Sequence, residues 1–62
     1  MTRAQWSAID DYCEEFGYKK SEVLKELKAN GAVDADATIK DLGDYTRGKT
    51  YDDMMNFLMM NL

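Results

Sequence analysis

The segment from Gly43 to Thr50, GDYTRGKT, satisfies in full the G-x-x-x-x-G-K-[ST] pattern of phosphate-binding loops. In proteins that use this pattern, backbone amides surround the phosphates, the lysine reaches the terminal phosphates and the hydroxyl holds magnesium. Such a loop follows a buried strand of a parallel sheet, which has a nearly continuous apolar sequence. Here residues 38–42 alternate charged and apolar side chains, and residues 51–62 leave no room for further strands. We therefore expect no nucleotide binding, despite the pattern.

A more modest interpretation of the same segment is an anion site made by Arg47, Gly48, Lys49 and Thr50. A helix that begins at Thr50 presents free backbone amides at its first turn, and such amides attract phosphate or carboxylate groups. The alternative is a solvated turn between two helices, whose glycines serve the backbone geometry. We favour the turn and keep the anion site as a hypothesis.

The single cysteine, Cys13, lacks a base that would activate it as a nucleophile, because the chain contains no histidine. One thiol without histidine also lacks the usual ligands of a structural zinc ion. We expect Cys13 to be a small buried hydrophobe on a helical stripe that also contains Trp6, Ile9 and Phe16. The sequence thus predicts no catalytic residue, no metal site and no cofactor.

Four carboxylates occupy the opposite side of the same predicted helix: Asp10, Asp11, Glu14 and Glu15. Nothing on a solvated face perturbs their pKa values in a way that acid–base catalysis needs, so we expect a water-exposed surface. One alternative function uses these carboxylates as substitutes for phosphates, in an acidic inhibitor that imitates nucleic acid. The formal net charge of −4 is compatible with this alternative.

Half of the eight basic residues lie in one short stretch: Lys19, Lys20, Lys25 and Lys28. Together with a turn at Gly31, this stretch has the spacing of two helices that meet at an angle in a helix-turn-helix. A DNA-binding or transcription-associated module is therefore a second alternative function. The candidate recognition helix at 36–46 carries Asp36, Asp41 and Asp44, whose charges would face phosphates unfavourably. We therefore rank nucleic-acid binding below protein binding.

The absence of proline and the scarcity of strong strand formers predict an all-α fold. We expect a single helical domain over residues 1–62, a compact bundle of three to four short helices at about 3–16, 22–30, 36–46 and 50–61.

Several residues define the ends of these helices. Thr2 with Gln5, and Thr50 with Asp53, have the form of capping boxes, and Ser21 is the expected N-cap of the second helix. Gly43 makes the third helix the weakest, because glycine in a helix interior costs on the order of 1 kcal/mol relative to alanine.

Chain length and composition limit the class of protein. A domain of 62 residues has a marginal core, and a single cysteine excludes an internal disulfide. The sequence contains no apolar run long enough to span a membrane and no signal-peptide pattern, so we expect a cytoplasmic protein without a membrane partner.

The last predicted helix has an unusual composition, since four of the five methionines lie between residues 54 and 60. A terminal helix of a small bundle buries about one side, but this helix is apolar nearly all round. Flexible, polarisable methionines are common where a surface accepts partners. The sequence therefore predicts a non-enzymatic protein-interaction module, which binds a protein partner or forms a homodimer. The expected contact residues are Met55, Phe57, Met59, Met60 and Leu62.

Overall fold

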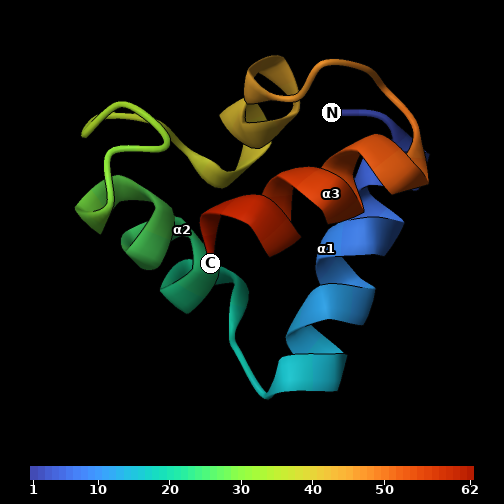
Figure 1. Cartoon of the computed structure of the whole chain (residues 1–62), viewed down its shortest axis with the longest axis horizontal. Helices are drawn as coiled ribbons and strands as arrows, with labels where there is room; N and C mark the ends of the chain where they lie inside the picture. The colour runs from blue at the N-terminus through green and yellow to red at the C-terminus, as the bar shows by residue number, and fades with distance from the viewer.

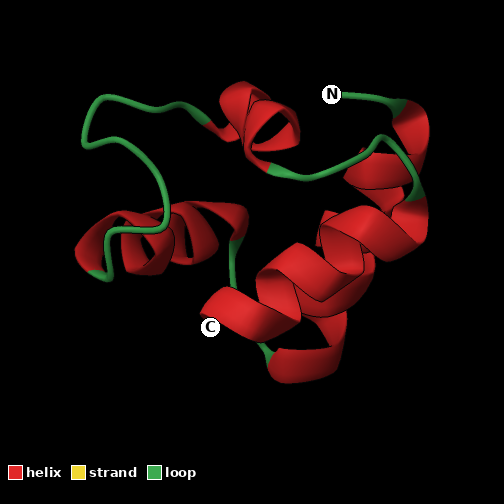
Figure 2. Cartoon of the chain, turned by 45° about the horizontal axis from the view of Figure 1, so that its top comes forward, coloured by secondary structure: helices red, strands yellow, loops and turns green.

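The computed structural model describes all 62 residues and contains four helices and no strand, which confirms the predicted all-α fold. The helices are α1 (Arg3–Phe16), α2 (Lys20–Ala29), the 3₁₀ helix η1 (Ile39–Tyr45) and α3 (Tyr51–Asn61). In Figure 1, α1 and α2 lie on opposite sides of the molecule and α3 runs from α1 toward α2, with η1 above it. Figure 2 shows the same helices joined by loops, of which the one between α2 and η1 is the most extended.

The start of α1 has the predicted capping box. The Thr2 hydroxyl accepts a hydrogen bond from the Gln5 backbone N–H at 3.2 Å, and the Gln5 side-chain oxygen accepts one from the Thr2 N–H at 2.8 Å. These two bonds satisfy amides that the first helical turn leaves free. Gly17 ends the helix in the left-handed region, with φ of 74°, where a residue with a Cβ is strained.

Helix α2 begins two residues earlier than predicted, and Ser21 is not its N-cap. Lys19 occupies the cap position, and the Glu22 carboxylate accepts a hydrogen bond from the Lys19 backbone N–H at 3.0 Å. A glutamate at the third helical position thus satisfies one free amide without a hydroxyl at the cap.

The third helix differs most from its prediction. In place of an α-helix over 36–46, the chain forms the seven-residue 3₁₀ helix η1, in which only Leu42 is buried. The Asp41 carboxylate accepts hydrogen bonds from the Thr38 N–H at 2.8 Å and from the Thr38 hydroxyl at 3.0 Å, which fixes the start of the helix. Gly43 weakens α-helix formation in this segment, and 3₁₀ geometry is common in short connecting pieces.

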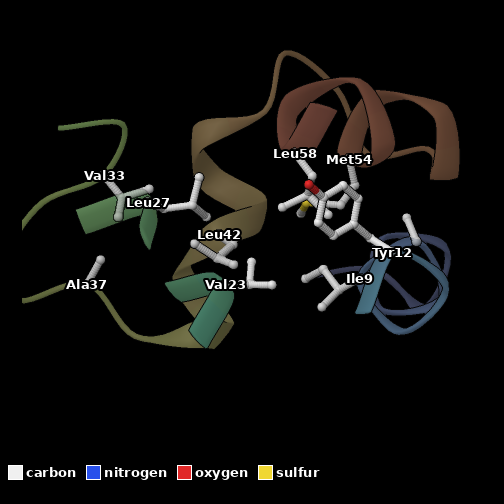
Figure 3. Packing of buried hydrophobic residues seen from close by; sticks show 10 residues of the cluster. Ile9, Tyr12, Val23, Leu27, Val33, Ala37, Leu42, Met54 and Leu58 are labelled. Carbon is white, nitrogen blue, oxygen red and sulfur yellow. The ribbon is translucent and has the colours of Figure 1, made fainter. Parts of the chain in front are cut away.

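The core is one cluster of ten buried side chains contributed by all four helices and by the α2–η1 loop: Ala8, Ile9, Tyr12, Val23, Leu27, Val33, Ala37, Leu42, Met54 and Leu58. Figure 3 shows Met54 and Leu58 of α3 above Tyr12 and Ile9, with Val33 and Leu27 at the other end of the cluster. Met54 and Leu58 are one turn apart, so α3 faces the core along a narrow stripe.

The buried stripe of α1 is not the predicted one. Gln5, Ala8, Ile9 and Tyr12 face the core, whereas Trp6 and Cys13 are partly exposed and Phe16 is 51% exposed. Both stripes have helical spacing, and Ile9 belongs to both, so periodicity alone did not distinguish them. The observed stripe buries Gln5 because its side chain forms hydrogen bonds inside the molecule.

Candidate functional site

The Gly43–Thr50 segment comprises the last three residues of η1 and the loop that leads to α3, and it passes the N-terminal end of α1. The side chain of Gln5, which is 1% exposed, holds this segment in place. Its amide nitrogen donates to the Thr46 hydroxyl at 3.0 Å, to the Gly48 carbonyl at 3.0 Å and, at 3.4 Å, to the Gly43 carbonyl. The carbonyls of both glycines of the pattern therefore point toward a buried side chain of α1.

Close approach explains why glycine occupies both positions. A Cβ at Gly43 would lie 2.6 Å from the Met1 side chain and 2.8 Å from the Gln5 side-chain oxygen. A Cβ at Gly48 would lie 2.1 Å from the Asp53 carboxylate. A side chain at Gly43 would therefore displace Met1 or Gln5, and a side chain at Gly48 would displace the Asp53 carboxylate.

The predicted anion site at the start of α3 already contains a carboxylate of the chain. Asp53 accepts hydrogen bonds from the Thr50 N–H at 3.2 Å and from the Thr50 hydroxyl at 2.8 Å. The Lys49 carbonyl accepts a hydrogen bond from the Thr2 hydroxyl at 2.7 Å, which ties this turn to α1. The Asp53 charge and the occupied hydroxyl oppose phosphate binding at Thr50. The 3₁₀ helix η1, which begins at Ile39 and extends into the segment, also occupies the place where a phosphate-binding loop needs a strand.

The four lysines predicted as a nucleic-acid surface lie on or next to α2, and Lys28 is partly buried. The Lys20 ammonium lies 2.8 Å from an Asp10 carboxylate oxygen and 5.3 Å from the centre of the Trp6 ring. This interaction is the only ion pair of the molecule, and it links the start of α2 to α1. The next helix along the chain is the short 3₁₀ helix η1, so the element that directly follows α2 is not the α-helix that a helix-turn-helix places in the major groove.

The methionine-rich helix exposes part of the predicted surface. Met60 is 84% exposed, Met59 is 57% exposed, and Leu62 is also exposed. Met55 and Phe57, two further expected contact residues, are partly buried and pack against the core. The Phe57 ring lies at one edge of the core because the narrow buried stripe of α3 leaves its neighbours only half covered.

Met59 and Met60 lie on different flanks of α3, since consecutive helical residues are about 100° apart. Met60 and Phe57 line a groove of about 410 Å³ between α3 and the 45–47 segment, which we call the Met60 groove. Its other lining residues are Tyr45, Thr46, Arg47, Asp53, Asn56 and Asn61. Arg47 and Met60, which were predicted as parts of two different sites, therefore line the same groove.

A second groove, of about 390 Å³, lies between α1 and α3, and we call it the α1–α3 groove. Its lining residues are Asp11, Tyr12, Glu14, Glu15, Phe16, Tyr51 and Met55. Sequence reasoning missed this groove because Phe16 was placed in the core and the carboxylates on a separate, fully solvated face. The signal available was the aromatic content near the end of α1, where Tyr12, Phe16 and Tyr18 cluster.

Cys13 is partly buried and packs against the core. Burial raises the pKa of the Cys13 thiol above its ordinary value, and the nearby Asp10 charge raises it further. A raised pKa lowers the fraction of reactive thiolate at neutral pH.

No group of three or more Cys, Asp or Glu side chains is arranged to hold a metal ion, and none of the helices is long and apolar enough to cross a bilayer. Comparison of this chain with protein-family models, curated proteins and solved structures finds no match.

Proposed function

We propose that this chain is a protein-interaction module, and that the Met60 groove with the neighbouring Met59 and Leu62 forms its contact surface. One observation carries the proposal: Met60 is 84% exposed at the rim of a groove that also contains the Phe57 ring. Exposed apolar side chains beside a concave surface are typical of places where another protein binds.

The polar residues of the Met60 groove support the same proposal. Arg47 has no ion-pair partner in the chain, and Asn56 offers amide donors and acceptors at the groove. Arginine is enriched at protein interfaces because its planar group makes several directed hydrogen bonds. The groove thus combines an apolar centre with polar groups able to orient a partner.

Both a second copy of the chain and a different protein fit this proposal, and two measurements separate them. Sedimentation velocity at several concentrations detects self-association of the wild-type chain. A partner other than the chain itself is detected in two steps. The chain retains the partner from extracts of the native host, and a photo-crosslinker at position 60 then joins the two proteins.

The variant Met60→Gln keeps the length of the side chain but makes it polar, and we expect it to weaken either association. Lys40→Gln, on the exposed side of η1, is the control and should behave as wild type. A strictly monomeric chain that retains no partner, or a partner retained equally by Met60→Gln, would contradict the proposal.

We rank DNA binding through Lys19, Lys20, Lys25 and Lys28 second, since the Lys20 charge is already paired with Asp10. Titration with duplex DNA at low and moderate salt tests this ranking. Binding by the wild type that disappears in the Lys19→Glu/Lys20→Glu variant would reverse it.

A further inference from the structure

The α1–α3 groove has an aromatic and apolar interior. Tyr12 is buried at its base, the Phe16 ring is 51% exposed beside it, and the two ring centres lie 4.6 Å apart. Tyr51 and Met55, both partly exposed, contribute the α3 side. The groove therefore offers ring surface from two helices to an incoming side chain.

The charge at this groove is of one sign. Its lining includes three exposed carboxylates, those of Asp11, Glu14 and Glu15, and contains no lysine or arginine. Asp11 accepts a hydrogen bond from the Tyr51 hydroxyl at 2.6 Å, while Glu14 and Glu15 have no ion pair and no side-chain hydrogen bond within the chain. Carboxylates clustered at a concave surface attract cations more strongly than the same charges spread over a flat surface.

We propose that the α1–α3 groove binds a basic segment of a partner protein, and that an arginine of that segment enters the groove. The guanidinium plane stacks on the Phe16 or Tyr51 ring, and its N–H groups donate to Glu14 or Glu15. Arginine fits better than lysine, because its planar group is weakly hydrated, stacks on aromatic rings and makes paired hydrogen bonds to carboxylates. This inference goes beyond the proposed function, because the α1–α3 groove lies on the opposite flank of α3 from the Met60 groove.

The test uses two labelled pentapeptides in which leucine alternates either with arginine or with citrulline, which has nearly the same shape but no charge. Each is titrated into the full chain labelled with ¹⁵N. We expect the arginine peptide to shift the amide signals of residues 11–16 and 51–55, and the citrulline peptide to bind at least about tenfold more weakly, as expected for loss of charge-assisted hydrogen bonds. Absence of shifts with the arginine peptide, or equal binding of both peptides, would overturn the proposal.

A matched pair of double variants tests whether the arginine peptide binds at this groove. Glu14→Gln/Glu15→Gln removes two negative charges at the groove, and Glu26→Gln/Asp44→Asn removes two exposed charges on α2 and η1. We expect the first variant to weaken arginine-peptide binding about fivefold to tenfold and the second to change it less than about twofold, because distant exposed charges are screened by salt. All four positions are exposed, so we expect each variant to fold, and circular dichroism is the check. Equal weakening by both variants would show a general charge effect and overturn the assignment to the groove.

Discussion

Gln5 is the only buried polar residue, and its side chain connects α1 to the Gly43–Thr50 segment. Replacing it with leucine leaves the Gly43 and Gly48 carbonyls and the Thr46 hydroxyl without this donor. The Thr46 hydroxyl is then the only side-chain donor left for the two carbonyls. We expect Gln5→Leu to lower the free energy of unfolding by about 1–3 kcal/mol, the usual cost when buried polar groups lose hydrogen-bond partners. Urea unfolding measures it, with the exposed Ser7→Ala on the same helix as control. A Gln5→Leu chain as stable as Ser7→Ala would show that these hydrogen bonds contribute little.

Gly43 gives a second prediction, which also tests the origin of the phosphate-loop pattern. A Cβ at this position collides with Met1 and with the Gln5 side chain, so Gly43→Ala should destabilise the fold by about 1–3 kcal/mol, as overpacking does. In an ordinary exposed helix position the same change would stabilise by about 1 kcal/mol. Thermal unfolding followed by circular dichroism gives the sign of the effect. A stabilised Gly43→Ala chain would contradict the close approach of Met1.

The Tyr51–Asp11 hydrogen bond predicts a dependence of stability on alkaline pH. The bond to the Asp11 carboxylate raises the pKa of Tyr51 above its ordinary value of 10.0, so the folded chain retains this proton longer than the unfolded chain. The contribution to stability is therefore complete below pH 10 and is lost as the pH rises through the folded-state pKa. We expect the stability difference between wild type and Tyr51→Phe to shrink above pH 10 in urea unfolding at pH 8 to 11. A difference that stays constant across this range would argue against the hydrogen bond.

At the scale of the element, α3 depends on the cap that connects Thr50 with Asp53. The Thr50 hydroxyl accepts a hydrogen bond from the Asp53 N–H at 3.1 Å, and the Asp53 carboxylate accepts one from the Thr50 N–H. We expect Thr50→Ala to cost about 0.5–2 kcal/mol in urea unfolding, the usual range for loss of an N-cap. Thr50→Ser keeps the hydroxyl and serves as the control, so equal losses in the two variants would exclude the capping explanation.

Local signals predicted three of the four helices within about two residues, together with the caps at Thr2 and Thr50. These features depend on neighbours in the sequence, which is why they could be predicted. The 3₁₀ form of η1 and the orientation of α1 depend on contacts between distant residues, chiefly those of Gln5 with the loop before α3.

The candidate surfaces were likewise predicted only where they depend on local sequence. Exposure of Met59, Met60 and Leu62 was predicted from helix composition, because a terminal helix of a small bundle buries only one side. Neither groove was predicted, because each depends on how two segments pack in space: α1 against α3 in one case, and the 45–47 segment against α3 in the other. The position of Phe16 outside the core was missed for the same reason.

At the scale of the whole molecule, ten buried side chains support 62 residues, so each large member of the core matters. Leu42 is fully buried and is the only buried residue of η1. We expect Leu42→Ala to cost about 2–5 kcal/mol, a large part of the total stability of a domain this small. The chain should then be partly unfolded at 37 °C by circular dichroism, whereas Ile39→Val, at a partly exposed position of the same helix, should remain folded. A fully folded Leu42→Ala chain would show that η1 contributes little to the core.

The position of Trp6 beside Lys20, outside the core, has a consequence for spectroscopy. Its indole is partly hydrated in the folded chain, so the emission wavelength changes little when the core comes apart. Because the Lys20 ammonium lies 5.3 Å from the centre of the Trp6 ring, we expect the emission intensity to change when the two groups separate at the corner between α1 and α2. Intrinsic fluorescence of this protein therefore reports on that corner and not on the whole core. If the fluorescence changes at a lower denaturant concentration than the far-ultraviolet circular dichroism, the corner between α1 and α2 opens before the helices unfold.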